Sequence, residues 1–198
     1  MNKQCKTFNN LARAYVGESC ARNRYDMLAK LAEKEGYKCL ADQIKLIATN
    51  EFNHARMMFS FLDALDDEII KNIDIQAGYP FKQKLHKLEL NIELASEDED
   101  NEASKIYPEF AKVAREEGYE DIAKFFENVI QVENCHKMLL KQIKEQFDNG
   151  TMYKKDKPTK WKCVSCGYEH TSQEAWKKCP LCGAPQGYVM LKIEDNAD

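Results

Sequence analysis

Two Glu-x-x-His pairs are the residues of this chain best suited to metal chemistry. They are Glu51 with His54 and Glu133 with His136. Side chains three residues apart lie on one face of an α-helix, so each pair presents a carboxylate and an imidazole to the same point. Two such pairs on facing helices, with glutamates from two further helices, form a carboxylate-bridged site for two iron or manganese ions.

The chain is internally repeated around these pairs. A shift of 82 residues relates Tyr25 to Tyr107, Lys30–Tyr37 to Lys112–Tyr119, Glu51 to Glu133 and His54 to His136. A single Glu-x-x-His motif is most often an exposed pair, but two at equivalent positions favour a shared metal site. The repeat therefore predicts a pseudo-two-fold four-helix bundle in which each half supplies similar ligands.

Long helices are needed to carry these ligands. Apolar side chains recur at three- and four-residue intervals over residues 11–147, and Gly36 and Gly118 are placed to end helices. The segment 74–84, which contains glycine and proline, is expected to be a crossover between two helical hairpins. A long crossover favours an all-α ferritin-like four-helix bundle over a simple up-and-down bundle.

The other two helices are each expected to supply a carboxylate. The first offers Glu18, whereas the third carries too many acidic residues for spacing to choose among them. These candidates are Glu93, Glu97, Asp98, Glu99, Asp100 and Glu102. The repeat maps Glu18 onto Asp100, which narrows the search to the residues around Asp100 without selecting one of them. An acidic run by itself is typical of a solvent-exposed helix face. Tyr25 and Tyr107 are either hydrogen-bond donors that orient the ligand carboxylates or core aromatics.

Four cysteines predict a second metal site with different ligands. They form two Cys-x-x-Cys-Gly motifs, made of Cys163, Cys166, Cys179 and Cys182. Four thiolates at this spacing make a tetrahedral site for iron or zinc. A structural zinc site is the commoner outcome, but the Cys-Pro-x-Cys-Gly form and the adjacent aromatic residues favour a one-iron redox centre, which takes up zinc in some recombinant proteins. The remaining cysteines, Cys5, Cys20, Cys39 and Cys135, have no framework spacing and are assigned no role.

Composition divides the chain into two parts and excludes several classes of protein. Residues 1–150 are predicted to form the bundle, and residues 151–198 a linker and a small module whose bound metal supplies folding energy. The net charge is −4, and no long basic block indicates nucleic acid as a partner. No apolar run approaches the roughly 20 residues of a membrane-spanning helix. The N-terminus lacks the apolar segment of a signal peptide, so the expected compartment is the cytoplasm.

With these motifs in hand, the chain resembles the rubrerythrin family along nearly its whole length. The resemblance rests on Gly17–Tyr25, Asn50–Ala55, Glu99-x-x-Glu102, Ile106–Ala111 and Glu133-x-x-His136. The cysteine motifs are similar to the shortened rubredoxin module that ends these proteins. Two features depart from the family pattern: Asp98 stands where the family usually has glycine, and the crossover looks longer than usual.

The resemblance implies a ligand set. It selects Glu99 and Glu102 from the acidic run of the third helix. It assigns one iron to Glu18, Glu51, His54 and Glu102, and the other to Glu99, Glu133 and His136, with Glu51 and Glu133 as bridges. In the family, one iron moves between a carboxylate and a histidine when its redox state changes, and the corresponding residues here are Glu102 and His54.

The resemblance also implies a function. It implies a homodimeric, non-haem di-iron peroxidase that reduces hydrogen peroxide to water in oxidative-stress defence, in an anaerobic or microaerobic microbe. Electrons would pass through the cysteine-bound iron from an NAD(P)H-dependent reductase or a separate rubredoxin, with the rubredoxin module of one subunit near the di-iron site of the other. One alternative is a ferroxidase or iron-handling protein, although iron storage needs no attached electron relay. Another is a non-enzymatic binding module with zinc at the cysteines.

Overall fold

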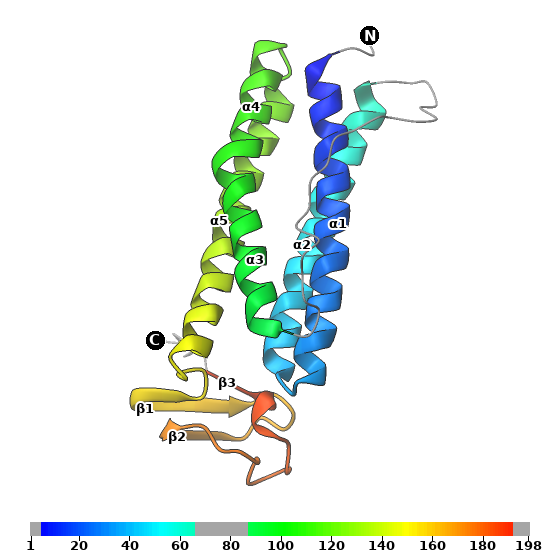
Figure 1. The fold of residues 1–198 in the computed structure, drawn as a ribbon. Helices are drawn as coiled ribbons and strands as arrows, with labels where there is room; N and C mark the ends of the chain where they lie inside the picture. Colours follow the sequence, from blue (N-terminus) through cyan, green and yellow to red (C-terminus); the bar gives the residue numbers. More distant parts are fainter. Residues whose placement is uncertain (1–4, 66–86, 192–198) are drawn as a thin grey trace, which may run out of the picture.

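The computed structural model of this chain describes residues 5–65 and 87–191. A helical bundle is followed by a small three-stranded sheet (Figure 1). The helices are α1 (Lys6–Lys34), α2 (Lys38–Leu65), α3 (Leu88–Asn101), α4 (Tyr107–Glu116) and α5 (Glu120–Asp148), and the π-helix η1 (Glu102–Ile106) joins α3 to α4. None of the helices in these two ranges is long and apolar enough to cross a membrane.

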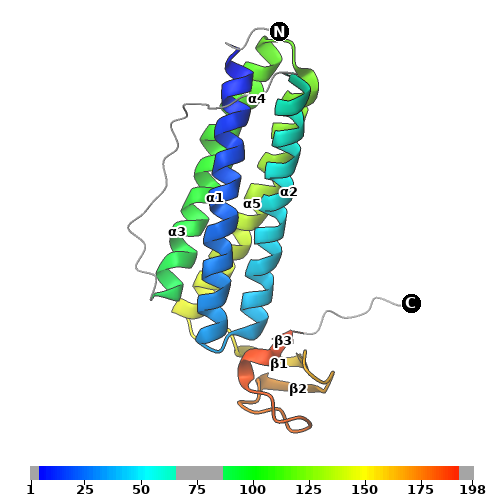
Figure 2. The same ribbon diagram turned by 90° about the vertical axis from the view of Figure 1, so that its right-hand side faces the viewer.

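The helices are arranged as two antiparallel hairpins. One consists of α1 and α2, and the other pairs the continuous α3–η1–α4 segment with α5 (Figures 1 and 2). Gly36 and Gly118 make the two tight turns at φ values of 91° and 85°, which glycine adopts without a steric penalty. Both α2 and α3 begin at the end of the bundle next to the sheet, so they run in the same direction, which is the ferritin-like order. The crossover expected at 74–84 lies outside the described residues.

Buried polar residues divide the apolar core of the bundle into two clusters. The cluster near the sheet includes Leu28, Ile44, Ile92 and Leu140. The cluster at the other end includes Leu11, Met58, Phe126 and Val129. Between them lie side chains that are almost fully buried although they carry charge or polar atoms: Glu18, Glu51, Glu99, Glu133 and His136. Burying charged groups is costly unless they are paired or bind metal, so this layer marks a functional site.

The C-terminal sheet has the strand order β2-β1-β3, with both pairs antiparallel. Its strands are β1 (Lys154–Cys163), β2 (Glu169–Glu174) and β3 (Val189–Leu191), and the short 3-10 helix η2 (Gln186–Tyr188) precedes β3. A core of this size is minimal: Trp161 packs with Ala175 and Val189, and its Nε1 donates to the carbonyl of Ser172 at 3.0 Å. Such a small unit depends on additional stabilisation such as a bound metal.

The sheet module packs against the end of the bundle where α1 turns into α2. The rings of Tyr37 and Tyr153 are nearly parallel, with centroids 6.4 Å apart, and Phe147 contacts Tyr37 edge-on at 5.2 Å. Gly187 in η2 approaches the backbone of Gly36 so closely that a Cβ atom built on it would lie 1.6 Å from the Gly36 carbonyl oxygen. Only a residue without a side chain allows this contact.

Replacing Gly187 with alanine is therefore expected to separate the module from the bundle end. The clash is with backbone atoms, so no rotamer change relieves it, and η2 has to move away from the turn. Amide hydrogen exchange at residues 36–40 should become faster, while the metal-dependent absorption of the cysteine site is retained. Gly150→Asn is the matched control, because Gly150 has φ of 64°, which asparagine tolerates, and open space around it. Unchanged exchange in Gly187→Ala would contradict this account of the docking.

Candidate metal centres

The first candidate site lies midway along the bundle, where four helices converge. Glu18 comes from α1, Glu51 and His54 from α2, Glu99 from α3, and Glu133 and His136 from α5. The two imidazole rings face each other across the site with their centroids 6.3 Å apart. The Glu-x-x-His spacing explains the convergence, because each pair occupies one face of its helix.

Glu51 and Glu133 each face both histidines. Glu51 Oε2 lies 3.0 Å from His54 Nδ1, and its Oε1 lies 3.1 Å from His136 Nδ1. Glu133 mirrors this, with Oε1 3.1 Å from His54 Nδ1 and Oε2 2.8 Å from His136 Nδ1. Each carboxylate therefore offers one oxygen to each side of the site, as a carboxylate that bridges two metal ions does.

Glu18 and Glu99 each face one side. Glu18 Oε2 lies 3.4 Å from His54 Nδ1, and Glu99 Oε2 lies 3.7 Å from His136 Nδ1. The side chains form two overlapping groups, and within each group the ligand atoms lie within 4.8 Å of one another. The first group is Glu18, Glu51, His54 and Glu133. The second group is Glu51, Glu99, Glu133 and His136. The site is thus built for two ions that share the two bridging carboxylates.

The donor atoms fit metal ligation. One oxygen on each of four glutamates is buried without a hydrogen bond of acceptable geometry: Glu18 Oε2, Glu51 Oε1, Glu99 Oε2 and Glu133 Oε1. Metal–ligand bonds of about 2.1 Å at right angles separate neighbouring donors by about 3 Å. The bridging oxygens lie 2.8–3.1 Å from the imidazole nitrogens. Carboxylates with one imidazole on each side suit two iron ions.

The two repeat-equivalent tyrosines donate hydrogen bonds across the repeat. The hydroxyl of Tyr25 in the first half donates to Glu99 Oε1 in the second, and the hydroxyl of Tyr107 donates to Glu18 Oε1. All four side chains are buried. Glu18 and Glu99 thus each have one oxygen that accepts from a tyrosine and another that faces a histidine. The contacts are those expected of donors that orient ligand carboxylates.

The two halves of the site differ by one residue. Glu18 and Tyr25 are seven residues apart, whereas Glu99 and Tyr107 are eight apart. The π-helix η1 lies within the longer interval, and its i→i+5 hydrogen bonds enclose one more residue than an α-helical turn does. The 82-residue shift maps Glu18 onto Asp100. Because the extra residue lies between Glu99 and Tyr107, the structural counterpart of Glu18 is instead Glu99.

Two other acidic residues near Glu99, Asp100 and Glu102, lie outside the two ligand groups. Asp100 is 58% exposed and pairs with Lys137 Nζ at 3.0 Å. Glu102, at the start of η1, is half-buried and belongs to neither of the two ligand groups. It is nevertheless close enough to interact electrostatically with Glu99 and Glu133. Six of the seven carboxylate-site ligands that the family resemblance implies are therefore brought together, and Glu102 lies beside them.

Burial and mutual contacts change the protonation of the cluster. Burial raises the pKa of Glu18 and of Glu102 well above the usual range, and it raises that of Glu99 to about 8. Burial opposes protonation of His54 and His136, but hydrogen bonds with the surrounding carboxylates outweigh it and raise both pKa values to about 12. Metal binding to this cluster would therefore displace protons from it.

The metal-free protein is accordingly expected to lose stability as the pH rises from about 5 to about 8. In this window the folded state binds more protons than the unfolded state, through Glu99 with its pKa of about 8 and through the two histidines. Stability then falls with increasing pH. Despite burial, hydrogen bonds with His136 and His54 lower the pKa of Glu51 to about 2. Glu51 therefore adds nothing to the dependence of stability on pH above about pH 5. Thermal unfolding followed by helical circular dichroism tests this, and iron-loaded protein should show a flatter profile. A midpoint that rises with pH in metal-free protein would contradict it.

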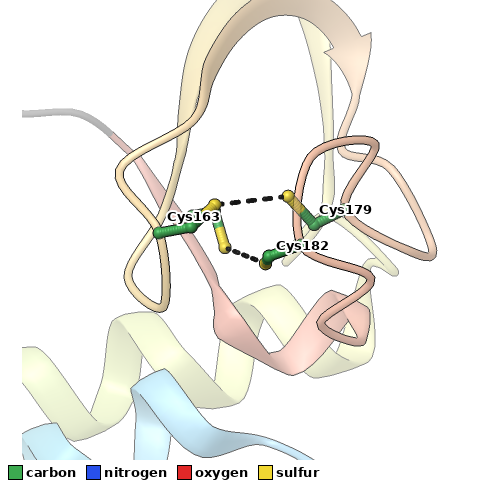
Figure 3. Close-up of side chains that lie close together, drawn as sticks. Cys163, Cys179 and Cys182 are labelled. Carbon is green, nitrogen blue, oxygen red and sulfur yellow. Dashed lines mark hydrogen bonds between the residues drawn. The ribbon is translucent and has the colours of Figure 1, made fainter.

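The second candidate site lies in the sheet module (Figure 3). The sulfurs of Cys163, Cys166, Cys179 and Cys182 all lie within 4.8 Å of one another. Cys163 Sγ is 3.8 Å from Cys182 Sγ, and Cys166 Sγ is 3.7 Å from Cys179 Sγ. Tetrahedral ligation with metal–sulfur bonds of about 2.3 Å gives edges of about 3.8 Å, so the four thiols fit one iron ion.

Two glycines shape the loops that hold these sulfurs. Gly167 and Gly183 follow the second cysteine of each motif and have φ values of 77° and 76°. The turns allow the backbone amide of Ala184 to donate to Cys182, which, together with the neighbouring thiols, lowers the pKa of Cys182 to about 7. Amide hydrogen bonds to thiolate sulfur also tune the reduction potential of iron when iron is bound.

One pair of residues next to the carboxylate site was not singled out by motif. Arg24 forms an ion pair with Asp98, beside the contact of Tyr25 with Glu99. The sequence carried a partial signal, since Asp98 departs from the glycine usual in the family. The arginine on another helix that it contacts is not identifiable from spacing.

Comparisons with known proteins agree with this architecture. The rubrerythrin family model matches residues 9–144, and the model of the rubrerythrin rubredoxin-like domain matches residues 161–188. Rubrerythrin from Clostridium perfringens is 36% identical over 186 residues, which cover 94% of this chain and 94% of that protein. Rubrerythrin from Nitratidesulfovibrio vulgaris is 33% identical over 189 residues, which cover 96% and 95%.

Solved structures show the same fold. A mixed-valence structure of nigerythrin aligns with a TM-score of 0.62 and 25% identity, over 97% of this chain and 92% of that one. Bacterioferritin from Desulfovibrio desulfuricans, described for its diiron site, aligns with a TM-score of 0.60 and 25% identity, over 73% and 81%. The shorter overlap with bacterioferritin is consistent with a bundle to which a cysteine module has been added. With matches to both parts and over nearly its full length, the chain belongs to the rubrerythrin family.

Proposed function

We propose that this protein is a peroxidase that reduces hydrogen peroxide to water in the cytoplasm. The reaction consumes two electrons and two protons for each peroxide and yields two water molecules. The observation that carries the proposal is the combination, in one chain, of two carboxylates that each face two histidines with a four-cysteine site. A pair of iron ions supplies the two electrons when bound, and the cysteine-bound iron suits the transfer of single electrons that restores them.

The proposed residue roles follow the geometry. Glu51 and Glu133 would bridge the two ions, His54 and Glu18 would bind one, and His136 and Glu99 the other. The proposed ligand set also includes Glu102, on the side of Glu18 and His54, where it would exchange with His54 when the redox state changes. Tyr25 and Tyr107 would hold Glu99 and Glu18 in orientation. Cys163, Cys166, Cys179 and Cys182 would bind the relay iron.

The separation of the two sites within one chain supports electron transfer between subunits. Glu51 lies 13 residues along α2 from Lys38, where the helix starts beside the sheet module. At 1.5 Å per residue this is about 20 Å of helix. Electron tunnelling slows exponentially with distance, so a module from a second subunit placed near the bundle site gives a shorter route. We therefore propose a homodimer in which residues 1–150 of one subunit work with residues 151–198 of the other.

An exposed aromatic surface on the first hairpin supports self-association. Phe52 and Phe59 project from α2 into solvent, where Arg22 of α1 lies over the ring of Phe52 at 4.8 Å and Tyr15 contacts Phe59 at 5.7 Å. Exposed apolar side chains that gather on one face are typical of interfaces. Analytical ultracentrifugation of wild-type protein and of a Phe52→Glu, Phe59→Glu double variant tests the dimer directly.

Anaerobic stopped-flow spectroscopy tests the peroxidase reaction. Fully reduced protein with verified iron at both sites is mixed with one equivalent of hydrogen peroxide, and the visible absorbance is followed. Rapid oxidation of the bundle site, followed by oxidation of the cysteine-bound iron, is the expected result. Slow or absent oxidation would rule the proposal out.

The same preparations separate peroxidase activity from iron handling. A peroxidase needs a reductant for each turnover, supplied here by an NAD(P)H-dependent reductase or a separate rubredoxin, and its bundle holds two iron ions. A ferroxidase of the bacterioferritin type would oxidise added ferrous iron without that donor and accumulate iron beyond two ions per bundle. Iron analysis after repeated additions of ferrous iron distinguishes these outcomes.

A further inference from the structure

An ion pair joins α1 to α3 directly beside the carboxylate site. Arg24 Nη1 contacts Asp98 Oδ2, and the two side chains are 11% and 26% exposed. Each partner precedes a residue of the site: Arg24 precedes Tyr25, and Asp98 precedes Glu99. The hydroxyl of Tyr25 donates to Glu99, so two adjacent polar contacts connect the same two helices at the same level. We propose that Arg24 and Asp98 are positioning residues that hold Tyr25 and Glu99 in their ligand-ready arrangement.

The contacts of Arg24 explain how the pair acts on its neighbours. Its guanidinium also lies over the ring of Tyr25, 5.6 Å from the centroid, so Asp98 fixes the cation against the ring that carries the donating hydroxyl. The pair is mostly shielded from water, and removing one partner from such a pair leaves a poorly solvated charge. The arginine is then expected to change position, and Tyr25 and Glu99 lose the group that orients them.

The ion pair has no equivalent in the other half of the site. Glu99 corresponds to Glu18, so Asp98 corresponds to Gly17, and the 82-residue shift relates Arg24 to Ile106. Glycine and isoleucine carry no charge, so this pair of positions supplies no ion pair beside the contacts of Glu18 with Tyr107 and His54. The structure therefore holds one of its two pseudo-symmetric ligand sets more firmly than the other. Asp98, the departure from the family pattern, creates this difference.

The expected effect is selective. With the proposed ligand assignment, on which this inference rests, loss of the pair should weaken the ion bound by Glu99 and His136 and leave the ion bound by Glu18 and His54 unchanged. Residues that orient metal ligands typically contribute 10–100-fold to affinity, so a loss of about 10-fold is expected in Asp98→Asn. A general loss of stability would weaken both ions alike.

The test is an anaerobic ferrous-ion titration combined with Mössbauer spectroscopy of the all-ferrous protein. Asp100→Asn is the matched control: it removes the same charge two residues away on the same helix, from a 58% exposed side chain paired with Lys137. Asp98→Glu should restore affinity towards the wild-type value, because it retains a carboxylate. Asp98→Gly reproduces the residue found at Gly17 and serves as a second disrupting variant if the asparagine variant folds poorly.

The outcomes are distinct. Weaker binding of one ion and a changed Mössbauer signal for one of two ferrous ions, in Asp98→Asn and Asp98→Gly but not in Asp100→Asn, would support the inference. Wild-type affinity and spectra in both Asp98 variants would overturn it while leaving the proposed function intact. Failure of wild-type protein to bind two ferrous ions in the bundle would overturn the ligand assignment and this inference together.

Discussion

Replacing Glu51 with alanine is expected to abolish binding of the iron pair and with it peroxide reduction, with an activity loss of more than about 100-fold. Like Glu133, Glu51 directs its two oxygens at different histidines, at 3.0 Å from His54 Nδ1 and 3.1 Å from His136 Nδ1. Its removal therefore deprives both ions of a ligand at once. Each ion would keep at most one bridging oxygen, from Glu133, and the two would no longer be held at a shared distance.

Glu51→Gln sharpens this test because it preserves side-chain volume while removing the charge and one donor oxygen. It should lose activity nearly as completely as the alanine variant, with helical circular dichroism unchanged. Glu116→Ala is the control, since Glu116 is an exposed glutamate of α4 whose partner is Lys112 at 3.9 Å. Two tightly bound iron ions in Glu51→Ala would exclude the bridging role. Anaerobic iron analysis and stopped-flow mixing with peroxide provide the measurements.

Replacing Cys179 with serine is expected to stop turnover without stopping the chemistry of the bundle. Cys179 is buried and its sulfur lies 3.7 Å from that of Cys166, so its loss opens the tetrahedral site. The module owes much of its stability to that metal and should lose its fold along with it. Peroxide-dependent NAD(P)H oxidation with an added reductase should fall by at least about 100-fold. Single-turnover oxidation of chemically reduced bundle iron should keep its wild-type rate.

The two halves of this experiment are informative together. Loss of both reactions would mean that the module is needed to form the bundle site and does not serve only as a relay. Unchanged reductase-linked turnover would mean that electrons enter the bundle by another route. Cys20→Ser provides the control, because Cys20 is an exposed cysteine of α1 outside the four-sulfur group.

Much of this architecture follows from local sequence rules. Helical periodicity and the two glycine turns predict the hairpins, and the structure confirms them at Gly36 and Gly118. The repeat predicts that the two Glu-x-x-His pairs converge, and the structure brings Glu51 and Glu133 together with both histidines. The cysteine motifs predict a tetrahedral site because their spacing is short and their loops are fixed by glycine.

Contacts between residues on different helices could not be predicted from the sequence. Spacing cannot reveal that Tyr25 donates to Glu99 across the repeat, because helical periodicity fixes the face of a helix but not its partner. The same limit applies to the ion pair of Arg24 with Asp98 and to the packing of Gly187 on Gly36. Each depends on how helices are docked, which only the whole fold determines.

The π-helix changes how residues in one half of the bundle correspond to residues in the other. A duplicated hairpin begins with two interchangeable halves, and every substitution that favours one has an equivalent in the other. The extra residue between Glu99 and Tyr107 ends that equivalence, because the shift between the halves is 81 residues from Glu18 to Glu99 and 82 from Tyr25 to Tyr107. Substitutions designed to treat the two halves alike therefore need an 81-residue shift before the π-helix and an 82-residue shift after it.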